Sequence, residues 1–219
     1  MKKLLSLLCS FSLVLCCNWS GPSPRPAPAA ERPLAADETL IKSSLFVDGP
    51  RYAATAFVYR GHILTAAHVC QAMEQTGPAH LQVALDSAVK LTDLADYLPV
   101  RASKYADVCE IAPVFAKSAA VRAVRELPPA KQPALGDPLA CVGAPAGVFP
   151  MMTKGVYAGV PLSAAQVVVA VPSYFGNSGG PVMDRYGDLV GMLVGGHPTY
   201  NYLSVIVPLA AIDYFVDNE

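Results

Sequence analysis

The feature of this chain that most directly indicates chemistry is a serine enclosed by glycines, in the sequence GNSGGP of residues 176–181. A serine hydroxyl attacks a carbonyl only when a base lies beside it, and the negative oxygen that then forms must be met by N–H donors. Glycines permit the tight turn that points two N–H groups at one spot. The stretch therefore predicts a nucleophile at Ser178 and an oxyanion hole at Gly176, Asn177 and Ser178, with the N–H groups of Gly176 and Ser178 as the donors.

A base for this serine has to come from elsewhere, and the chain has four histidines. His68 closes an apolar run, HILTAAH, whose small residues allow a bulky imidazole to be packed and aimed. The other three, His62, His80 and His197, stand beside or shortly after glycine and proline residues that are typical of turns. His68 is thus the candidate general base.

A carboxylate that orients the imidazole is expected between the histidine and the serine. Asp107, in the sequence YADVCEI, heads a short apolar run and is the first choice. Asp93 and Asp96 are the alternatives.

The order His, Asp, Ser, with the motifs TAAHV, ADV and GNSGGP, resembles the trypsin-like serine proteases. The segment GDLVGM that follows the serine loop is more similar to the bacterial HtrA and glutamyl-endopeptidase branches than to animal digestive enzymes. The resemblance covers roughly residues 44–216. It implies a Ser178–His68–Asp107 triad that hydrolyses peptide bonds through an acyl-enzyme, acts on proteins or peptides, and needs no metal or other cofactor.

Asn177 carries a further implication of the resemblance. In digestive members an aspartate stands at this place and pairs with the N-terminus that zymogen cleavage releases. Asparagine is neutral and cannot form that ion pair. We therefore expect the oxyanion hole to form without proteolytic activation.

The resemblance also implies a substrate-binding pocket around the serine loop, formed by Ser173, Phe175, Val194, Gly195 and Gly196. None of these residues is acidic, so a preference for arginine or lysine lacks its usual counter-charge. An apolar or small residue before the cleaved bond is expected. A preference for glutamate, assisted by His197 or Lys154, is the alternative.

Short β-branched and aromatic runs separated by glycine and proline indicate an all-β barrel or sandwich. The resemblance narrows this to two six-stranded antiparallel β-barrels with the active site in the cleft between them. We place the first barrel at about 40–127, a proline-rich linker at 128–134, the second barrel at 135–207 and a C-terminal helix at 208–217. Strands are expected at 44–47, 54–59, 81–85, 108–111, 138–142, 166–171, 189–194 and 203–207.

The N-terminus has the pattern of an export signal, because two lysines precede the apolar stretch Leu4–Leu15. Residues 1–17 are the expected signal peptide, and Cys16 or Cys17 is a candidate for lipidation. The proline-rich residues 18–39 suit an extended tether. The alternative is an arm without lipid. We expect an exported protein: periplasmic, anchored to a membrane as a lipoprotein, or secreted.

Composition and the remaining cysteines add two points. A net charge of −1 argues against a basic nucleic-acid surface. Cys70 and Cys109 each follow a proposed triad residue by two positions, so contact between His68 and Asp107 would bring them close enough for a disulfide, which an exported protein tolerates. Buried free thiols, Cys141 included, are the alternative.

Three other functions compete with an active protease. An α/β-hydrolase can use Gly-x-Ser-x-Gly, but it orders its triad Ser, acid, His, and only 41 residues follow Ser178. A catalytically inactive trypsin-like homologue would bind peptides or a partner. A maturation protease would cleave its own precursor or a co-encoded partner.

Overall fold

A computed structural model describes residues 37–84, 91–114, 124–197, 199–200 and 202–219. The predicted signal peptide, the candidate lipidation sites at Cys16 and Cys17, and nearly all of the predicted tether lie outside the described residues. Within the described part of the chain, no helix is long and apolar enough to span a membrane.

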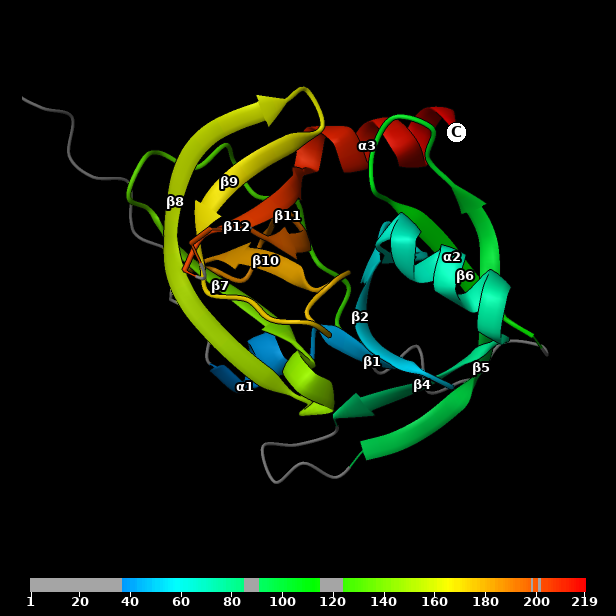
Figure 1. Cartoon of the computed structure of the whole chain (residues 1–219). Coiled ribbons are helices and arrows are strands. Elements are labelled where there is room, and N and C mark those ends of the chain that lie inside the picture. The colour runs from blue at the N-terminus through cyan, green and yellow to red at the C-terminus, as the bar shows by residue number, and fades with distance from the viewer. Residues whose placement is uncertain (1–36, 85–90, 115–123, 198, 201) are drawn as a thin grey trace, which may run out of the picture. The chain divides into compact units, whose positions relative to one another are not determined.

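Within the described residues, twelve strands form two closed antiparallel barrels, which confirms the all-β, two-barrel prediction (Figure 1). The first barrel has the order β1-β2-β3-β6-β5-β4. Its strands are β1 (Ser44–Gly49), β2 (Tyr52–Tyr59), β3 (His62–Thr65), β4 (Ala79–Ala84), β5 (Leu91–Ala102) and β6 (Cys109–Pro113).

The second barrel has the order β10-β11-β12-β9-β8-β7. Its strands are β7 (Pro138–Gly143), β8 (Met151–Ser163), β9 (Gln166–Ala170), β10 (Pro181–Asp184), β11 (Leu189–Gly196) and β12 (Ser204–Pro208). The helical elements are α1 (Asp37–Ile41), α2 (Ala67–Thr76), the short 3₁₀ turn η2 (Pro145–Gly147) and the C-terminal α3 (Leu209–Asn218).

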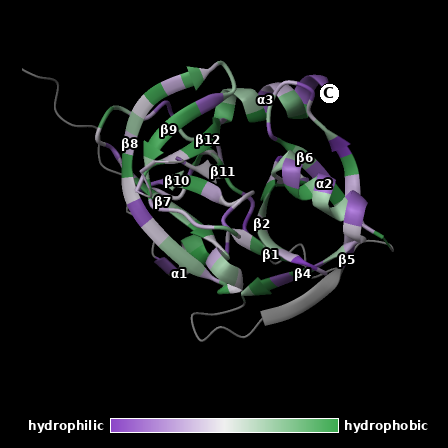
Figure 2. Ribbon diagram, in the orientation of Figure 1, coloured by the Kyte–Doolittle hydropathy of each residue, from purple (hydrophilic) through white to green (hydrophobic). Residues whose placement is uncertain are grey.

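The largest hydrophobic cluster draws on both barrels. It joins Leu45 and Phe57 of the first barrel to Met183 and Met192 of the second, together with Phe215 of α3. Along the outer strand β8, by contrast, hydrophobic and hydrophilic residues are interspersed (Figure 2), and most of its side chains are exposed or half-buried. The largest core therefore extends from the first barrel into part of the second, while a separate cluster that includes Val169, Val182 and Ile206 lies within the second barrel.

Several elements differ from the expected ones. Each predicted strand overlaps an observed strand, but β3, β5, β8 and β10 were not anticipated. The segment after the apolar run is the helix α2, which buries Val69, Cys70 and Met73 at helical spacing. The expected linker is anchored to the second barrel by two backbone hydrogen bonds. The N–H of Leu189 donates to the carbonyl of Pro128, and the N–H of Ala130 donates to the carbonyl of Leu189.

Candidate active site

His68 occupies the second position of α2, directly after the turn that follows β3. Ala66 lies in extended conformation before the helix, and its carbonyl accepts hydrogen bonds from Val69 and Cys70. The buried Val69 and Cys70 fix this first turn against the barrel, whereas the His68 side chain is 45% exposed. The ring is thus held by its backbone and remains accessible to a substrate.

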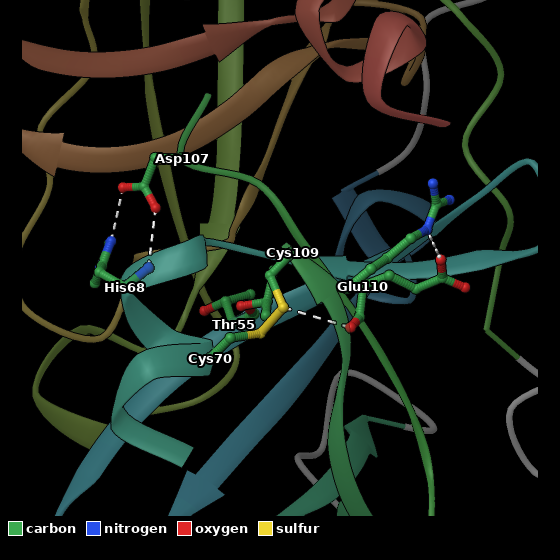
Figure 3. The surroundings of a disulfide bond; sticks show 8 residues. Thr55, His68, Cys70, Asp107, Cys109 and Glu110 are labelled. Carbon is green, nitrogen blue, oxygen red and sulfur yellow. Dashed lines mark hydrogen bonds and ion pairs between the residues drawn. A yellow bond between two sulfur atoms is a disulfide. The ribbon is translucent and has the colours of Figure 1, made fainter. Parts of the chain in front are cut away.

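Asp107 lies in the connection between β5 and β6 and binds His68 twice (Figure 3). One carboxylate oxygen is 2.7 Å from Nδ1 of His68, and the other accepts the His68 backbone N–H at 3.0 Å. These contacts fix both the ring and the start of α2. They also direct Nε2 of His68 away from the carboxylate, where it is available for proton transfer.

Opposing effects act on the Asp107 carboxyl. Its burial alone would raise the pKa, but the hydrogen bonds and the charge of His68, with the N–H of Ala67, lower the pKa below the ordinary aspartate value. Asp107 is therefore a carboxylate at neutral pH.

The competing residues have other partners. His80 contacts Asp96 at 3.0 Å, and His62 contacts Glu110 at 2.8 Å. The side chain of Asp93, the other alternative carboxylate, lies outside the described part of the chain. The structure therefore brings His68 together with Asp107 and pairs Asp96 with a different histidine.

The loop that carries Ser178 needs glycine for steric reasons. Gly176 has a φ of +103°, and a Cβ there would come within 2.0 Å of the carbonyl oxygen of Ala144. The N–H of the buried Asn177 donates to Tyr174, while in the described part of the chain no hydrogen bond uses the N–H of Gly176 or Ser178. Of the three residues predicted for an oxyanion hole, the two flanking ones thus keep their N–H groups for a ligand.

Thr55 on β2 holds this loop from the opposite barrel, a role that sequence reasoning missed. Its hydroxyl donates to the carbonyl of Gly176 at 2.8 Å and accepts the N–H of Ala144 at 3.1 Å. Its backbone N–H donates to the carbonyl of Ser178 at 2.9 Å. The Thr55 hydroxyl is fully buried and therefore needs hydrogen-bond partners, but the sequence around it does not indicate that they lie in the second barrel.

Two cavities meet at His68 and Ser178, which line both. The Arg51 cavity, about 520 Å³, extends past Ala53 and Gly147. The Ser173 cavity, about 450 Å³, contains all five residues predicted to bind substrate, namely Ser173, Phe175, Val194, Gly195 and Gly196, and also His197. Lys154, offered as an aid to glutamate binding, instead pairs with Asp37 at 2.9 Å.

A disulfide joins Cys70 to Cys109 near the His68–Asp107 contact (Figure 3). Both cysteines are buried, and the bridge ties α2 to β6. The bridge, and not a pair of free thiols, is therefore the correct alternative. Cys141 is free, and burial raises the pKa of its thiol to about 12, which keeps it protonated. Among the residues that the structure describes, no cluster of three or more His, Cys, Asp or Glu side chains could hold a metal ion.

Comparison with known proteins agrees with the two-barrel fold. The family model of the trypsin-like peptidase domain matches residues 54–192. No curated protein matches the chain. Rv3671c from Mycobacterium tuberculosis H37Rv, solved as an inactive Ser343Ala mutant, is 15% identical with a TM-score of 0.60, over 83% of this chain and 93% of the other. The serine endoprotease from Yersinia pestis is 16% identical with a TM-score of 0.68, over 85% and 67%.

Proposed function

This chain belongs to the trypsin-like peptidase family, and from this premise we propose that it is an active serine endopeptidase with Ser178 as the nucleophile. The observation that carries the proposal is the double contact of Asp107 with His68, at the edge of two cavities that Ser178 also lines. A structural His–Asp pair would not need to border the space that holds the serine.

In the proposed mechanism His68 takes the proton of Ser178 as the hydroxyl attacks the peptide carbonyl. Asp107 keeps the proton of the neutral imidazole on Nδ1, so that Nε2 accepts, and it stabilises the imidazolium that forms. The N–H groups of Gly176 and Ser178 stabilise the oxyanion. His68 then protonates the leaving amine, and water releases the acyl group by the same steps.

Active-site labelling by a fluorophosphonate, combined with hydrolysis of a protein substrate, tests the proposal. Ser178→Ala should abolish labelling and lower kcat by roughly ten-thousand-fold or more, and His68→Ala and Asp107→Asn should slow both reactions strongly. His80→Ala is the matched control, because it removes a histidine from another His–Asp pair of similar length. It should react like the wild type.

Two results would count against the proposal. If Ser178→Ala still hydrolyses protein at the wild-type rate, another residue is the nucleophile. If the folded wild type is neither labelled nor active, the chain is an inactive homologue that binds peptides or a partner. Comparing the intact masses of the wild type and Ser178→Ala reveals whether the protein cleaves itself, as a maturation protease would.

We also propose that the domain works outside the cytoplasm. The lysines before the apolar Leu4–Leu15 support export, and the buried Cys70–Cys109 bridge is of a kind that persists in oxidising compartments. Fractionation of bacteria should find the full chain beyond the inner membrane and a variant lacking residues 2–17 in the cytoplasm. A lipid anchor would be identified by incorporation of an alkyne-tagged fatty acid that is lost in Cys16→Ala or in Cys17→Ala. A soluble extracytoplasmic protein without this label would contradict the lipid anchor but not export.

A further inference from the structure

The polar side chains of the Ser173 cavity indicate what kind of residue the cavity accepts. Apart from His68 and Ser178, these are Ser173, Tyr174 and His197, and among the described residues no aspartate, glutamate, lysine or arginine lines the cavity. Ser173 and Gly196 lie next to each other in the lining, because a Cβ at Gly196 would be 3.5 Å from the Ser173 hydroxyl. A bound side chain would therefore meet neutral hydrogen-bonding groups.

The hydroxyl of Ser173 has its proton already engaged. The buried Ser204, at the start of β12, has its hydroxyl 2.5 Å from the carbonyl of Val171 and 2.7 Å from the Ser173 hydroxyl. A carbonyl can only accept, so the single proton of Ser204 goes to Val171. Ser173 must then donate its own proton to Ser204, and towards the cavity it offers only lone pairs.

His197, unlike Ser173, has its hydrogen-bond acceptor engaged and its donor free. Its Nδ1 accepts the backbone N–H groups of Thr199 at 3.2 Å and Tyr200 at 3.3 Å, and the ring stacks on Tyr200. With Nδ1 accepting, the proton of the neutral ring resides on Nε2. His197 is therefore a donor to a ligand, and Ser173 is an acceptor.

We propose that the Ser173 cavity selects a carboxamide side chain, that of glutamine or asparagine, in the residue before the cleaved bond. The carboxamide N–H would donate to Ser173, and its C=O would accept from His197. The proposal rests on the proposed protease function, and it departs from the expectation of an apolar or small residue.

The same two groups disfavour the competing side chains. A glutamate carboxylate has no proton to give to Ser173, and in the described part of the chain no lysine or arginine lines the cavity to offset its charge. An aliphatic side chain would remove both Ser173 and His197 from water without replacing their hydrogen bonds. Selection would therefore depend on hydrogen-bond direction as well as on size.

Matched peptides that differ only in the residue before the cleaved bond test the proposal, with glutamine, glutamate, methionine and leucine compared. We expect kcat/KM for glutamine to exceed each of the others by about tenfold or more. Each peptide is also used to slow fluorophosphonate labelling of Ser178, so that the preference is measured even where turnover is slow. A preference for leucine, methionine or glutamate in labelled, active enzyme overturns the proposal and leaves the protease function intact; absence of labelling overturns the function itself.

Variants test the direction of each hydrogen bond. Ser173→Ala should lose most of the preference for glutamine over methionine while Ser178 is still labelled. Ser204→Ala frees the proton of Ser173, so we expect the discrimination of glutamine against glutamate to fall. His197→Phe keeps a ring for stacking and removes the donor, and should lower the rate for glutamine selectively.

Ser163→Ala, on an exposed part of the β8–β9 hairpin, is the matched control and should keep the wild-type order of peptides. The melting temperature of each variant reports whether it is folded. Unchanged selectivity in folded Ser173→Ala and folded His197→Phe would overturn the proposal.

Discussion

The hydroxyl of Thr55 satisfies two buried backbone groups at once, the carbonyl of Gly176 and the N–H of Ala144. Thr55→Val keeps the shape and leaves both groups unpaired, so we expect a loss of about 1–3 kcal/mol in the free energy of unfolding. Because the Gly176 peptide would also lose its support, the rate of fluorophosphonate labelling should fall by roughly tenfold or more at temperatures where the variant is folded.

Thr55→Ser provides the comparison, because serine restores a hydroxyl at the same place. Thr55→Ser should recover most of the labelling rate. Its KM for substrate hydrolysis should be close to that of the wild type. If Thr55→Val is less stable but is labelled at the full rate, Thr55 supports the fold only.

The carboxyl of Asp107 makes stability depend on pH. Its pKa is lower in the folded protein than in the unfolded chain, so between the two values the unfolded state binds more protons and stability rises with pH. The contribution is present above the unfolded value of about 4 and is lost as the pH falls through the folded value. Asp107→Asn should thus lower the free energy of unfolding near neutral pH, and the difference from the wild type should shrink in acid.

Denaturant titrations at a series of pH values measure this difference. Glu110 also has a lowered pKa: its burial acts to raise it, but His62 and Arg101 outweigh that effect. The acid dependence that remains in Asp107→Asn should therefore come partly from Glu110. A constant difference across the whole series would show that the Asp107 carboxylate is not the titrating group.

At the scale of elements, the disulfide fixes α2 against β6. Cys70 and Cys109 are 39 positions apart, a separation for which loop-closure entropy predicts a stabilisation of about 4 kcal/mol. The double variant Cys70→Ala/Cys109→Ala should lose stability of this order in chemical denaturation. When reductant is present during denaturation, the wild type should lose a similar amount of stability and the double variant should be unchanged. An equal loss in both would mean that the disulfide is not the source of the stabilisation.

Elements with a strong local pattern were predictable from the sequence, and those set by distant partners were not. The glycines around Ser178 and the short apolar runs of β2 and β11 have that local pattern. β8 was missed because Gly155, Gly159 and Pro161 interrupt it and most of it is exposed. The role of Thr55 depends on a partner 121 residues away, which no local pattern reveals.

At the scale of the whole molecule, α3 follows the second barrel and is tied to the first. Tyr59 donates its hydroxyl to Asp213 at 2.7 Å, and Arg101 donates to the carbonyl of Phe215 at 3.0 Å and covers its ring. Figure 1 shows α3, in red, reaching from the second barrel toward the first. The chain's last helix thus closes the core that both barrels share.

Phe215→Ala should therefore destabilise the domain as a unit, by about 3–5 kcal/mol, because the ring is fully buried. Tyr214→Ala, which truncates an exposed neighbouring ring on the same helix, is the control and should cost much less. Urea unfolding followed by circular dichroism measures both. Two separate transitions in Phe215→Ala, with one barrel unaffected, would contradict a shared core.

The backbone hydrogen bond from Thr55 to Ser178 has a consequence for how the proposed activity would arise during synthesis. A ribosome makes β2 early and reaches the serine loop only after most of the chain has emerged. The loop of Ser178 can take up its position only after it has been synthesised and pairs with β2, which is made earlier. Chains that have not yet reached the serine loop would accordingly lack the proposed activity.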